Sequence, residues 1–331
     1  MAAVSRALIR TFTCRFTRTF TRTFTRTFTR TFTRTFTRTF TRSVRLQADV
    51  QPAKAGRYVL ILLLLAAPLG AQARRIISII PSTTEMLFAM GAGSRVTAIG
   101  TYDTYPPEAQ ALPRVGALID PNVEQILQMR PDLVVVYGTQ TELKRRLDRA
   151  NIPYYSYAHK GLADITSTIR TLGVRAGAEA AGEALAARLE RQLADIRARV
   201  AKRPRPKTLL VFGREPGSLR NIDASGGDGF LHDMLEIAGG ADVLGDIHRQ
   251  SVTMSTEMVL ARAPDVIIEL RYSKDTINNS DMTAWNRLGA VPAVKNHRVV
   301  LLAGEEFVVP GPRVAQATRR MAAALHPELQ W

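Results

Sequence analysis

The stretch NVEQILQMRPDLVVVYG (122–138) has a counterpart later in the chain, STEMVLARAPDVIIELR (255–271). Each begins with a side chain that can cap a helix, followed by a glutamate and an apolar helical pattern. Each then passes through a basic residue and Pro-Asp into an apolar run typical of a buried strand. Two copies of one helix-to-strand unit in 331 residues indicate two related lobes.

The residues around the first copy extend it into a lobe that spans 74–161. Strands are expected at 75–81, 95–100, 132–138 and 154–159, and helices at 84–93, 122–130 and 141–151. Ser82 and Glu85 have the spacing of a capping box at the start of the first helix. Alternating strands and helices favour a parallel sheet with helices on both faces.

A helical segment at 162–206 connects this lobe to the second. Leu and Ala at helical spacing predict about 25 continuous helical residues from Ala178 to Lys202, about 37 Å long. The second lobe, 207–331, repeats the pattern, with strands at 208–214, 265–271 and 298–304 and helices at 229–240, 255–262 and 312–328. We therefore expect an α/β fold of two similar lobes with mainly parallel sheets flanked by helices. One long rigid α-helix joins them, and a ligand cleft lies between them.

The first 73 residues have a different character. Residues 1–56 contain a near-perfect Thr-Phe-Thr-Arg repeat, a low-complexity leader that is expected to be disordered or not translated. Residues 57–73 have the basic, apolar and small-residue regions of an export signal cleaved near Ala73. An uncleaved anchor at 58–70 is the second interpretation. A membrane- or nucleic-acid-associated protein that acts through the Phe/Arg repeat is the alternative from another class.

The formal charge of +16 depends on that leader. Residues 1–73 hold 13 of the 45 Lys and Arg residues but only Asp49 among the 29 acids, so the remainder has a net charge near +4. This removes the main support for a nucleic-acid partner. The single cysteine, Cys14, also lies there, so the expected mature chain has no disulfide, thiol nucleophile or Cys-based metal site. No Walker lysine or G-x-S-x-G motif is present, so no enzyme is expected.

Several segments in order resemble the periplasmic cobalamin, haem and ferric-siderophore binding proteins of ABC importers. They are RIISIIPSTTEMLFAMGAGSRVTAIG (75–100), YPPEAQALPRVG (105–116) and the two copies of the repeated unit. The likeness is closest to the cobalamin-binding branch. It implies a monomeric periplasmic receptor, without an intrinsic cofactor, that delivers a cobalamin-like or iron-chelate ligand to an inner-membrane permease and its ATPase. A haem-binding protein of the same fold is the alternative.

The resemblance also implies which residues line the cleft. Tyr102 and Tyr105 follow the second strand, and the next two residues, both proline, would stiffen their loop. Leu118 or Ile119 stands where the cobalamin branch has a stacking tryptophan, and Ser251 where the second lobe would supply another. The other predicted ligand residues are Arg214, Arg220, Arg271, Tyr272, Glu305 and Phe307. No protein metal site is expected, except Tyr102 as an axial ligand if the guest is haem.

A second functional surface is implied at the two copies of the repeated unit. Glu124 and Glu257 match the family's permease-docking glutamates, one from each lobe. Carboxylates of this kind pair with arginines across an interface.

Overall fold

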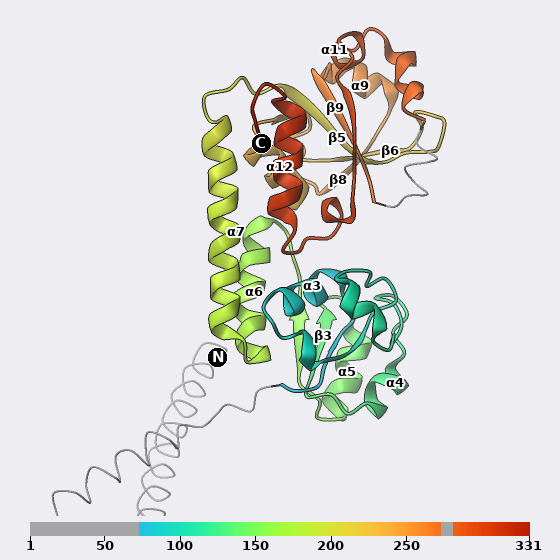
Figure 1. Cartoon of the computed structure of the whole chain (residues 1–331). Coiled ribbons are helices and arrows are strands. Elements are labelled where there is room, and N and C mark those ends of the chain that lie inside the picture. Colours follow the sequence, from blue (N-terminus) through green and yellow to red (C-terminus); the bar gives the residue numbers. More distant parts are fainter. Residues whose placement is uncertain (1–72, 273–280) are drawn as a thin grey trace, which may run out of the picture. The chain divides into compact units, whose positions relative to one another are not determined.

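Residues 70–331 form one compact unit, and the computed structural model describes residues 73–272 and 281–331 of it. The unit consists of two α/β lobes joined by a pair of helices (Figure 1). The predicted leader lies outside the described residues, as does the predicted export signal except for Ala73. Within the described ranges, no helix has the length and apolar character needed to cross a membrane.

The first lobe contains a four-stranded, fully parallel sheet in the order β2-β1-β3-β4. Its elements are β1 (Ile76–Ser78), α3 (Pro81–Ala89), η1 (Gly93–Arg95), β2 (Val96–Ile99), η2 (Pro107–Ala111), α4 (Val123–Gln128), β3 (Leu133–Tyr137), α5 (Thr141–Arg149) and β4 (Tyr154–Tyr157). The predicted parallel sheet is confirmed, and β1 and β3 are its central strands.

The predicted capping box at the start of α3 is wrong. The N-cap is Ile80, which makes no side-chain cap, and Pro81 occupies the first helical turn. Proline suits that position because its missing N–H would have no helical partner. Glu85 is turned inward and 3% exposed, because it pairs with an arginine of the second lobe.

The second lobe contains a mixed sheet in the order β10-β9-β5-β6-β8, with β7 paired to β5. Its elements are β5 (Lys207–Gly213), β6 (Ile222–Ser225), α8 (Phe230–Ile237), β7 (Ala241–Asp242), β8 (Ser251–Met254), α9 (Thr256–Arg262), β9 (Val266–Arg271), η3 (Met282–Leu288), α11 (Pro292–Lys295), β10 (Val299–Ala303), η4 (Glu305–Phe307) and α12 (Val314–Leu325). β6 pairs antiparallel with both β5 and β8, whereas the other pairings of this sheet are parallel.

The repeated sequence unit folds in the same way in both lobes. Asn122 caps α4 by accepting from the Gln125 N–H at 3.0 Å, and Ser255 caps α9 by accepting from the Met258 N–H at 3.3 Å. The Pro-Asp step has a common purpose too. Asp132 accepts from the N–H of Arg75 at 3.0 Å, and Asp265 accepts from the N–H of Lys207 at 3.0 Å. Each carboxylate thereby holds the start of a neighbouring chain segment beside the strand.

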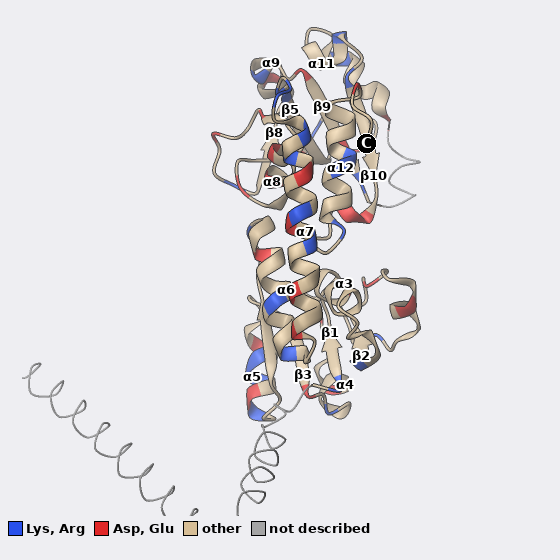
Figure 2. Cartoon of the chain, turned by 60° about the vertical axis from the view of Figure 1, so that its left-hand side comes forward, with Lys and Arg blue, Asp and Glu red and all other residues tan. Residues whose placement is uncertain are grey.

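The predicted long connecting helix is present, and a second helix packs antiparallel along it. α6 (Leu162–Ala176) ends at Gly177, and α7 (Glu179–Val200) runs back along it for 22 residues, about 33 Å. Gly173 and Gly182 let the helices approach closely, because a Cβ on Gly182 would lie 2.9 Å from the Ile169 carbonyl oxygen. Basic and acidic residues are interspersed along this pair (Figure 2), and Arg170 of α6 forms ion pairs with Glu183 and Glu190 of α7.

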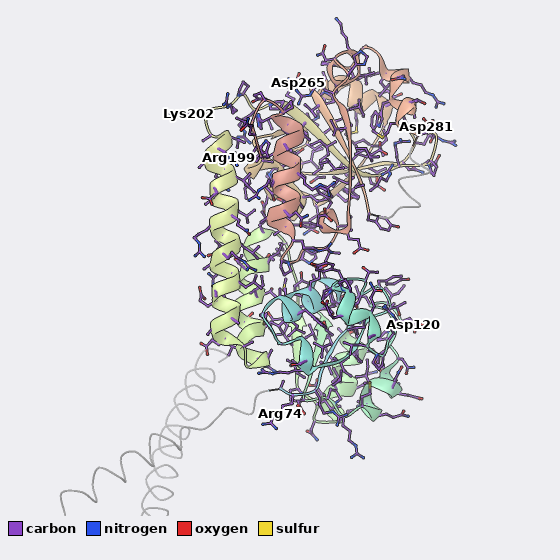
Figure 3. The ribbon with its side chains drawn as sticks, in the orientation of Figure 1. Arg74, Asp120, Arg199, Lys202, Asp265 and Asp281 are labelled. Carbon is purple, nitrogen blue, oxygen red and sulfur yellow. The ribbon has the colours of Figure 1, made fainter. Side chains whose placement is uncertain are left out.

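The core explains why the pair joins the lobes firmly. One continuous apolar cluster runs from the first sheet through α6 and α7 to α8 and α12 of the second lobe. A second cluster fills the other face of the second sheet around Trp285. At the end of α7, near the labelled residues Arg199 and Lys202 in Figure 3, the Arg199 guanidinium lies 4.9 Å from the centre of the Trp331 ring. The predicted rigid connection is therefore made by packing as well as by helix continuity.

Candidate functional site

The loop after β2 is held in place by one arginine from the following segment. Arg114 Nη1 donates to the carbonyl oxygens of Gly100, Thr101 and Asp103 at 2.9, 2.9 and 3.1 Å. The loop turns at Tyr105–Pro106, a cis peptide bond. Tyr102 and Tyr105 are 70% and 41% exposed, so this fixed loop presents two aromatic rings at the surface.

Behind the tyrosines lies a buried carboxyl group. Asp103 is 0% exposed and packs against the backbone of Gly100, where an added Cβ would meet its Oδ2 at 2.6 Å. Burial raises the pKa of Asp103 to about 6, because the neighbouring Arg114 and local hydrogen bonds offset only part of the lost hydration. The loop is therefore built around a group that titrates near neutrality.

The first junction between the lobes is a charged group that we call the Arg313 cluster, made of Glu85, Tyr105, Glu305, Glu306 and Arg313. Arg313, just before α12, donates to Glu85 of α3 at 3.0 Å from Nε and 2.5 Å from Nη2. Its guanidinium carbon also lies 4.0 Å from the centre of the Tyr105 ring. Glu305 and Glu306 approach the same guanidinium at 3.6 and 3.8 Å. One arginine of the second lobe thus contacts both α3 and the tyrosine loop of the first.

The two partners of the central ion pair respond differently to burial. Burial raises the pKa of Glu85 above its ordinary value, although Arg313 lowers it. The carboxylates of Glu85, Glu305 and Glu306 raise the pKa of Arg313 despite its own burial. The charged form of the arginine is therefore favoured at this junction, whereas burial opposes the charged form of Glu85. Thr104 adds a direct bond between the lobes by donating to Glu305 at 2.8 Å.

The second junction lies where β4 leads into α6. Tyr157, His159 and Phe230 form a row of rings, with centroid separations of 5.6 Å and 6.0 Å between successive members. Asp233 of α8 accepts from the Leu162 N–H at 2.8 Å. Burial lowers the pKa of His159, which favours its neutral form. Aromatic packing and one cap thus join the lobes on this side.

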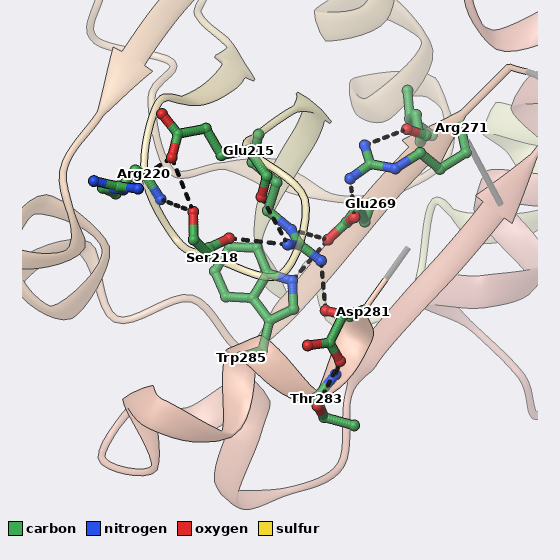
Figure 4. Close-up of polar contacts among 10 residues, drawn as sticks. Glu215, Ser218, Arg220, Glu269, Arg271, Asp281, Thr283 and Trp285 are labelled. Carbon is green, nitrogen blue, oxygen red and sulfur yellow. Dashed lines mark hydrogen bonds and ion pairs between the residues drawn. The ribbon is translucent and has the colours of Figure 1, made fainter. Parts of the chain in front are cut away.

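The predicted ligand residues Arg214 and Arg271 are turned into the second lobe (Figure 4). Arg214 has a fully buried side chain and donates to Glu269 at 2.9 Å and to the Asp281 carbonyl oxygen at 2.7 Å. Arg271 pairs with the other Glu269 oxygen, and the Trp285 N–H donates to Glu269 at 2.7 Å. Burial lowers the pKa of Arg271. Both guanidinium groups are therefore used to compensate a buried carboxylate, and the geometry does not place them against a ligand.

The other predicted positions divide by exposure. Phe307 is 0% exposed beneath Arg320, so the expectation that it faces a ligand is corrected. Leu118 packs against the core while its neighbour Ile119 is 92% exposed, so Ile119 is the surface member of that pair. Tyr272 is 55% exposed at the end of β9. Arg220 has an 80% exposed side chain and pairs with Glu215 at 2.8 Å.

A pocket of about 270 Å³ opens on the second lobe beside both junctions. Its apolar lining comes from the end of β5, the start of α8 and the segment after η4, and its polar rim from the start of β8 and the α8 cap. The lining residues are Phe212, Asp228, Gly229, Phe230, Leu231, Gln250, Ser251 and Val308. Phe230 also contacts His159, and Val308 follows the η4 turn whose Glu305 contacts Thr104. The pocket therefore adjoins the region where the lobes meet.

The predicted docking glutamates occupy equivalent places. Glu124 lies in the first turn of α4 and Glu257 in the first turn of α9, and both are exposed. Hydrogen bonds from Ser255 and from the backbone lower the pKa of Glu257, so this carboxylate is ionised. In residues 73–272 and 281–331, no three His, Cys, Asp or Glu side chains gather as metal ligands.

These features define a class of protein: two α/β lobes, held at a fixed separation by packed helices, with aromatic surfaces where the lobes meet. The chain belongs to the periplasmic binding protein family, whose sequence model matches residues 76–305. It is a substrate-binding protein of the ABC-transporter type, and the family consists of transport components without enzymatic activity.

Three similar proteins illustrate the family. An ABC transporter substrate-binding lipoprotein of Bacillus subtilis is 25% identical over 77% of this chain and 81% of its own length. The vitamin B12-binding protein of Vibrio cholerae is 28% identical over 79% of this chain and 92% of its own. The structure of a periplasmic haem-binding protein from Roseiflexus sp. RS-1 superposes with a TM-score of 0.67 and 26% identity, covering 78% of this chain and 100% of that one.

Two residues of the site were not identified from the sequence. Arg114 and Arg313 each follow a proline, in LPRVG (112–116) and GPRV (311–314), which places them just past a turn where they can reach back to a neighbouring segment. Glu269 gave a clearer signal. A glutamate within the apolar strand VIIELR (266–271) must find cations when it is buried, which accounts for Arg214 and Arg271.

Proposed function

We propose that this protein is a periplasmic receptor that binds a cobalamin-like metal chelate between its lobes and delivers it to an inner-membrane permease and its ATPase. The observation that carries the proposal is the pair of tyrosines on a fixed loop, with Tyr272 exposed on the other lobe. Tyrosine rings held in place can stack on a flat macrocycle and hydrogen-bond to its polar edge with little loss of side-chain entropy. The B12-binding relative supports this ligand class.

The charges favour a ligand without carboxylates. Two of the three predicted arginines, Arg214 and Arg271, are committed to Glu269, and Arg313 is committed to Glu85. Glu305, a predicted ligand residue, adds a partly exposed negative group at the junction. The carboxylates of a haem or of a carboxylate siderophore would come close to the Glu305 carboxylate. Arg214, Arg271 and Arg313 are already paired with protein carboxylates and would not neutralise them. A corrinoid with amide side chains avoids this cost.

Haem is the second candidate because of one observation. Tyr102 is 70% exposed, so its phenolic oxygen is accessible to an incoming iron as an axial ligand. The haem-binding relative gives this alternative further support.

Absorption spectroscopy separates the candidates. Purified protein is titrated with cyanocobalamin, haemin and a ferric siderophore, and bound ligand is measured after gel filtration. We expect stoichiometric retention of the corrinoid and a weaker affinity after Tyr102→Ala and Tyr105→Ala, because stacking area is lost. Retention of haemin alone, with a changed Soret band that Tyr102→Phe abolishes, would establish the alternative. Turnover of none of the ligands is expected.

We further propose that Glu124 and Glu257 dock on arginines of the permease. Changing both to Ala should abolish uptake in cells and leave ligand affinity intact. Glu142 and Glu179, exposed first-turn glutamates of α5 and α7, are the matched controls, and changing them to Ala should preserve uptake. A loss of ligand affinity in the Glu124/Glu257 variant would contradict a docking role.

Sequencing the N-terminus of the exported protein tests the proposed cleavage of the signal near Ala73.

A further inference from the structure

The four strands of the first sheet begin at the end of the first lobe that faces away from the second lobe. Thr104, in the loop after β2, contacts Glu305, directly after β10, so the carboxyl ends of the parallel strands of both lobes lie toward each other. The opposite edge of the first sheet is therefore an outer end of the protein. Figure 3 shows Arg74, which precedes β1, at this end.

Arginines gather at this outer edge because the chain segments that lead into the strands meet there. The segments are 74–75, 93–95, 129–132, 148–153 and 175–178, and together they hold six arginines and two aspartates, a net charge of +4. The expected mature chain as a whole has a net charge near +4, so the remainder is close to neutral. The six residues, which we call the basic edge, are Arg74, Arg75, Arg95, Arg130, Arg149 and Arg175.

The charge of the basic edge is not neutralised by carboxylates. Among the residues that the structure describes, none of the six arginines takes part in an ion pair. Arg75 and Arg95 donate to the carbonyl oxygens of Met129 and Ala176, at the ends of α4 and α6. A carbonyl oxygen at a helix end is a favourable partner for a cation, but it leaves the net charge unchanged.

The corresponding edge of the second lobe is basic as well, but two of its arginines are paired. Arg205, before β5, pairs with Glu236, and Arg262, before β9, pairs with Asp246 at 2.8 Å. Basic residues at both edges agree with the helix dipole, which favours cations where helices end. The dipole does not account for six arginines without a carboxylate partner at one edge, which leaves that edge suited to an external anion.

Two further features of the basic edge suit a membrane surface. Val174, next to Arg175 near the end of α6, is 56% exposed. Only residues 71–73 separate Arg74 from the apolar segment 58–70 of the expected export signal. Four extended residues span at most about 14 Å, so the basic edge stays close to the lipid headgroups for as long as that segment lies in the membrane.

We propose that the basic edge is an interaction surface for the anionic phospholipid headgroups of the membrane across which the chain is exported. Guanidinium groups hold phosphate oxygens through several N–H donors at once, and the exposed Val174 adds an apolar contact between the headgroups. The surface uses neither the tyrosine loop nor Glu124 and Glu257. It is therefore independent of the ligand and of the proposed contact with the permease.

Cosedimentation with vesicles tests the proposal on the exported protein. One set of vesicles contains phosphatidylcholine alone, and the other contains equal parts of phosphatidylcholine and phosphatidylglycerol. The edge variant combines Arg74→Gln, Arg130→Gln and Arg149→Gln. These arginines are exposed, and their side chains make no hydrogen bond to the described residues, so the fold should be kept. Equal melting temperatures check this.

The matched control removes the same charge from the second lobe. It combines Arg203→Gln, Lys207→Gln and Lys295→Gln, three exposed cations at the edge where β5 and β10 begin. A second measurement does not depend on removing charge. Val174→Trp places an indole at the basic edge, and Leu260→Trp places one at an exposed position of α9.

We expect the wild type to sediment with the phosphatidylglycerol vesicles alone and to be released by high salt. The edge variant should bind at least about tenfold more weakly, because each arginine near an anionic surface contributes about fivefold, and the control should stay within about twofold of wild type. Phosphatidylglycerol vesicles should shift the fluorescence of Val174→Trp to shorter wavelength and leave that of Leu260→Trp unchanged.

Three results would overturn the assignment. If the wild type does not sediment with phosphatidylglycerol vesicles, lipid is not the partner, and an acidic protein surface would be the occupant. If the edge variant and the control lose affinity equally, binding follows net charge and has no defined surface. A fluorescence shift in Leu260→Trp without one in Val174→Trp places the contact on the second lobe. Each of these results leaves the proposed ligand-binding function intact, because no ligand is present in the assay.

Discussion

The Arg313 cluster makes a quantitative prediction about how the lobes are joined. Arg313→Met removes the ion pair that joins α3 to the start of α12, where the side chains of Glu85 and Arg313 are 3% and 17% exposed. Removing one partner of a buried pair leaves an uncompensated charge and costs about 3–5 kcal/mol. Glu85→Gln should cost less, about 1–2 kcal/mol, because the amide still accepts from Arg313, which also keeps Glu305 and Glu306 nearby.

The coupling between these two residues is the decisive quantity. In the double variant, Arg313→Met no longer leaves a buried carboxylate at position 85 without a cation, so the cost of the double variant should fall short of the sum of the single costs by about 2 kcal/mol. Urea unfolding followed by circular dichroism measures the four proteins, and the comparison is valid where the slope with denaturant is unchanged. Arg170→Met is the control, because Arg170 also pairs with two glutamates but at a solvent-exposed site, and it should shift the midpoint much less.

Ligand affinity separates the two roles of Arg313. Its guanidinium lies against the Tyr105 ring as well as against Glu85. Arg313→Met should therefore weaken ligand binding, whereas Glu85→Gln should leave it nearly unchanged because the ring keeps its support. Additive unfolding free energies, with a coupling below about 0.5 kcal/mol, would refute the ion pair as a link between the lobes.

Two further predictions concern buried charges. Asp103 has a folded-state pKa of about 6, above its ordinary value, so folding binds a proton between about pH 4 and 6 and stability falls as pH rises through that window, by about 3 kcal/mol in total. Asp103→Asn should therefore gain stability over wild type progressively across this range, whereas a difference in unfolding free energy that does not change with pH would contradict the assignment. Arg214→Met should cost about 3–5 kcal/mol in urea unfolding without lowering the affinity of the folded protein, because its guanidinium serves Glu269. Arg220→Met should leave the free energy of unfolding unchanged. A loss of ligand affinity in the Arg214 variant alone would indicate that Arg214 contacts the ligand.

The architecture could be predicted from the sequence because its signals are local and occur twice. Asn122 and Ser255 are strong N-caps, and the Pro-Asp steps end each helix and begin each strand. The antiparallel strands β6 and β8 were not predicted because each has only four residues, several of them polar. Their sequences, IDAS and SVTM, contain no alternation of apolar and polar residues long enough to indicate a strand. The pairing of α6 with α7 depends on Gly173 meeting Gly182, a contact that no periodicity predicts.

The site was harder to predict because the same residue type serves two purposes. Arginines at strand ends are equally suited to bind an anionic ligand or to neutralise a buried acid. Arg214 and Arg271 do the second, and this follows from Glu269 lying on a strand that is buried along its whole length. Exposure distinguishes the tyrosines from Arg214 and Arg271, and exposure is set by tertiary packing rather than by local sequence.

Several arginine side chains hold the elements of this protein in place. Its arginines fix geometry: Arg114 holds the tyrosine loop, Arg313 joins the lobes, and the buried Arg214 pairs with Glu269 inside the second lobe. Guanidinium groups suit this role because they bind several oxygens at once in fixed directions. The exposed tyrosine rings beside the first junction are then free to contact a flat guest. Under the proposed function, such a receptor would select its ligand by fit, and Glu124 and Glu257 would remain for the permease.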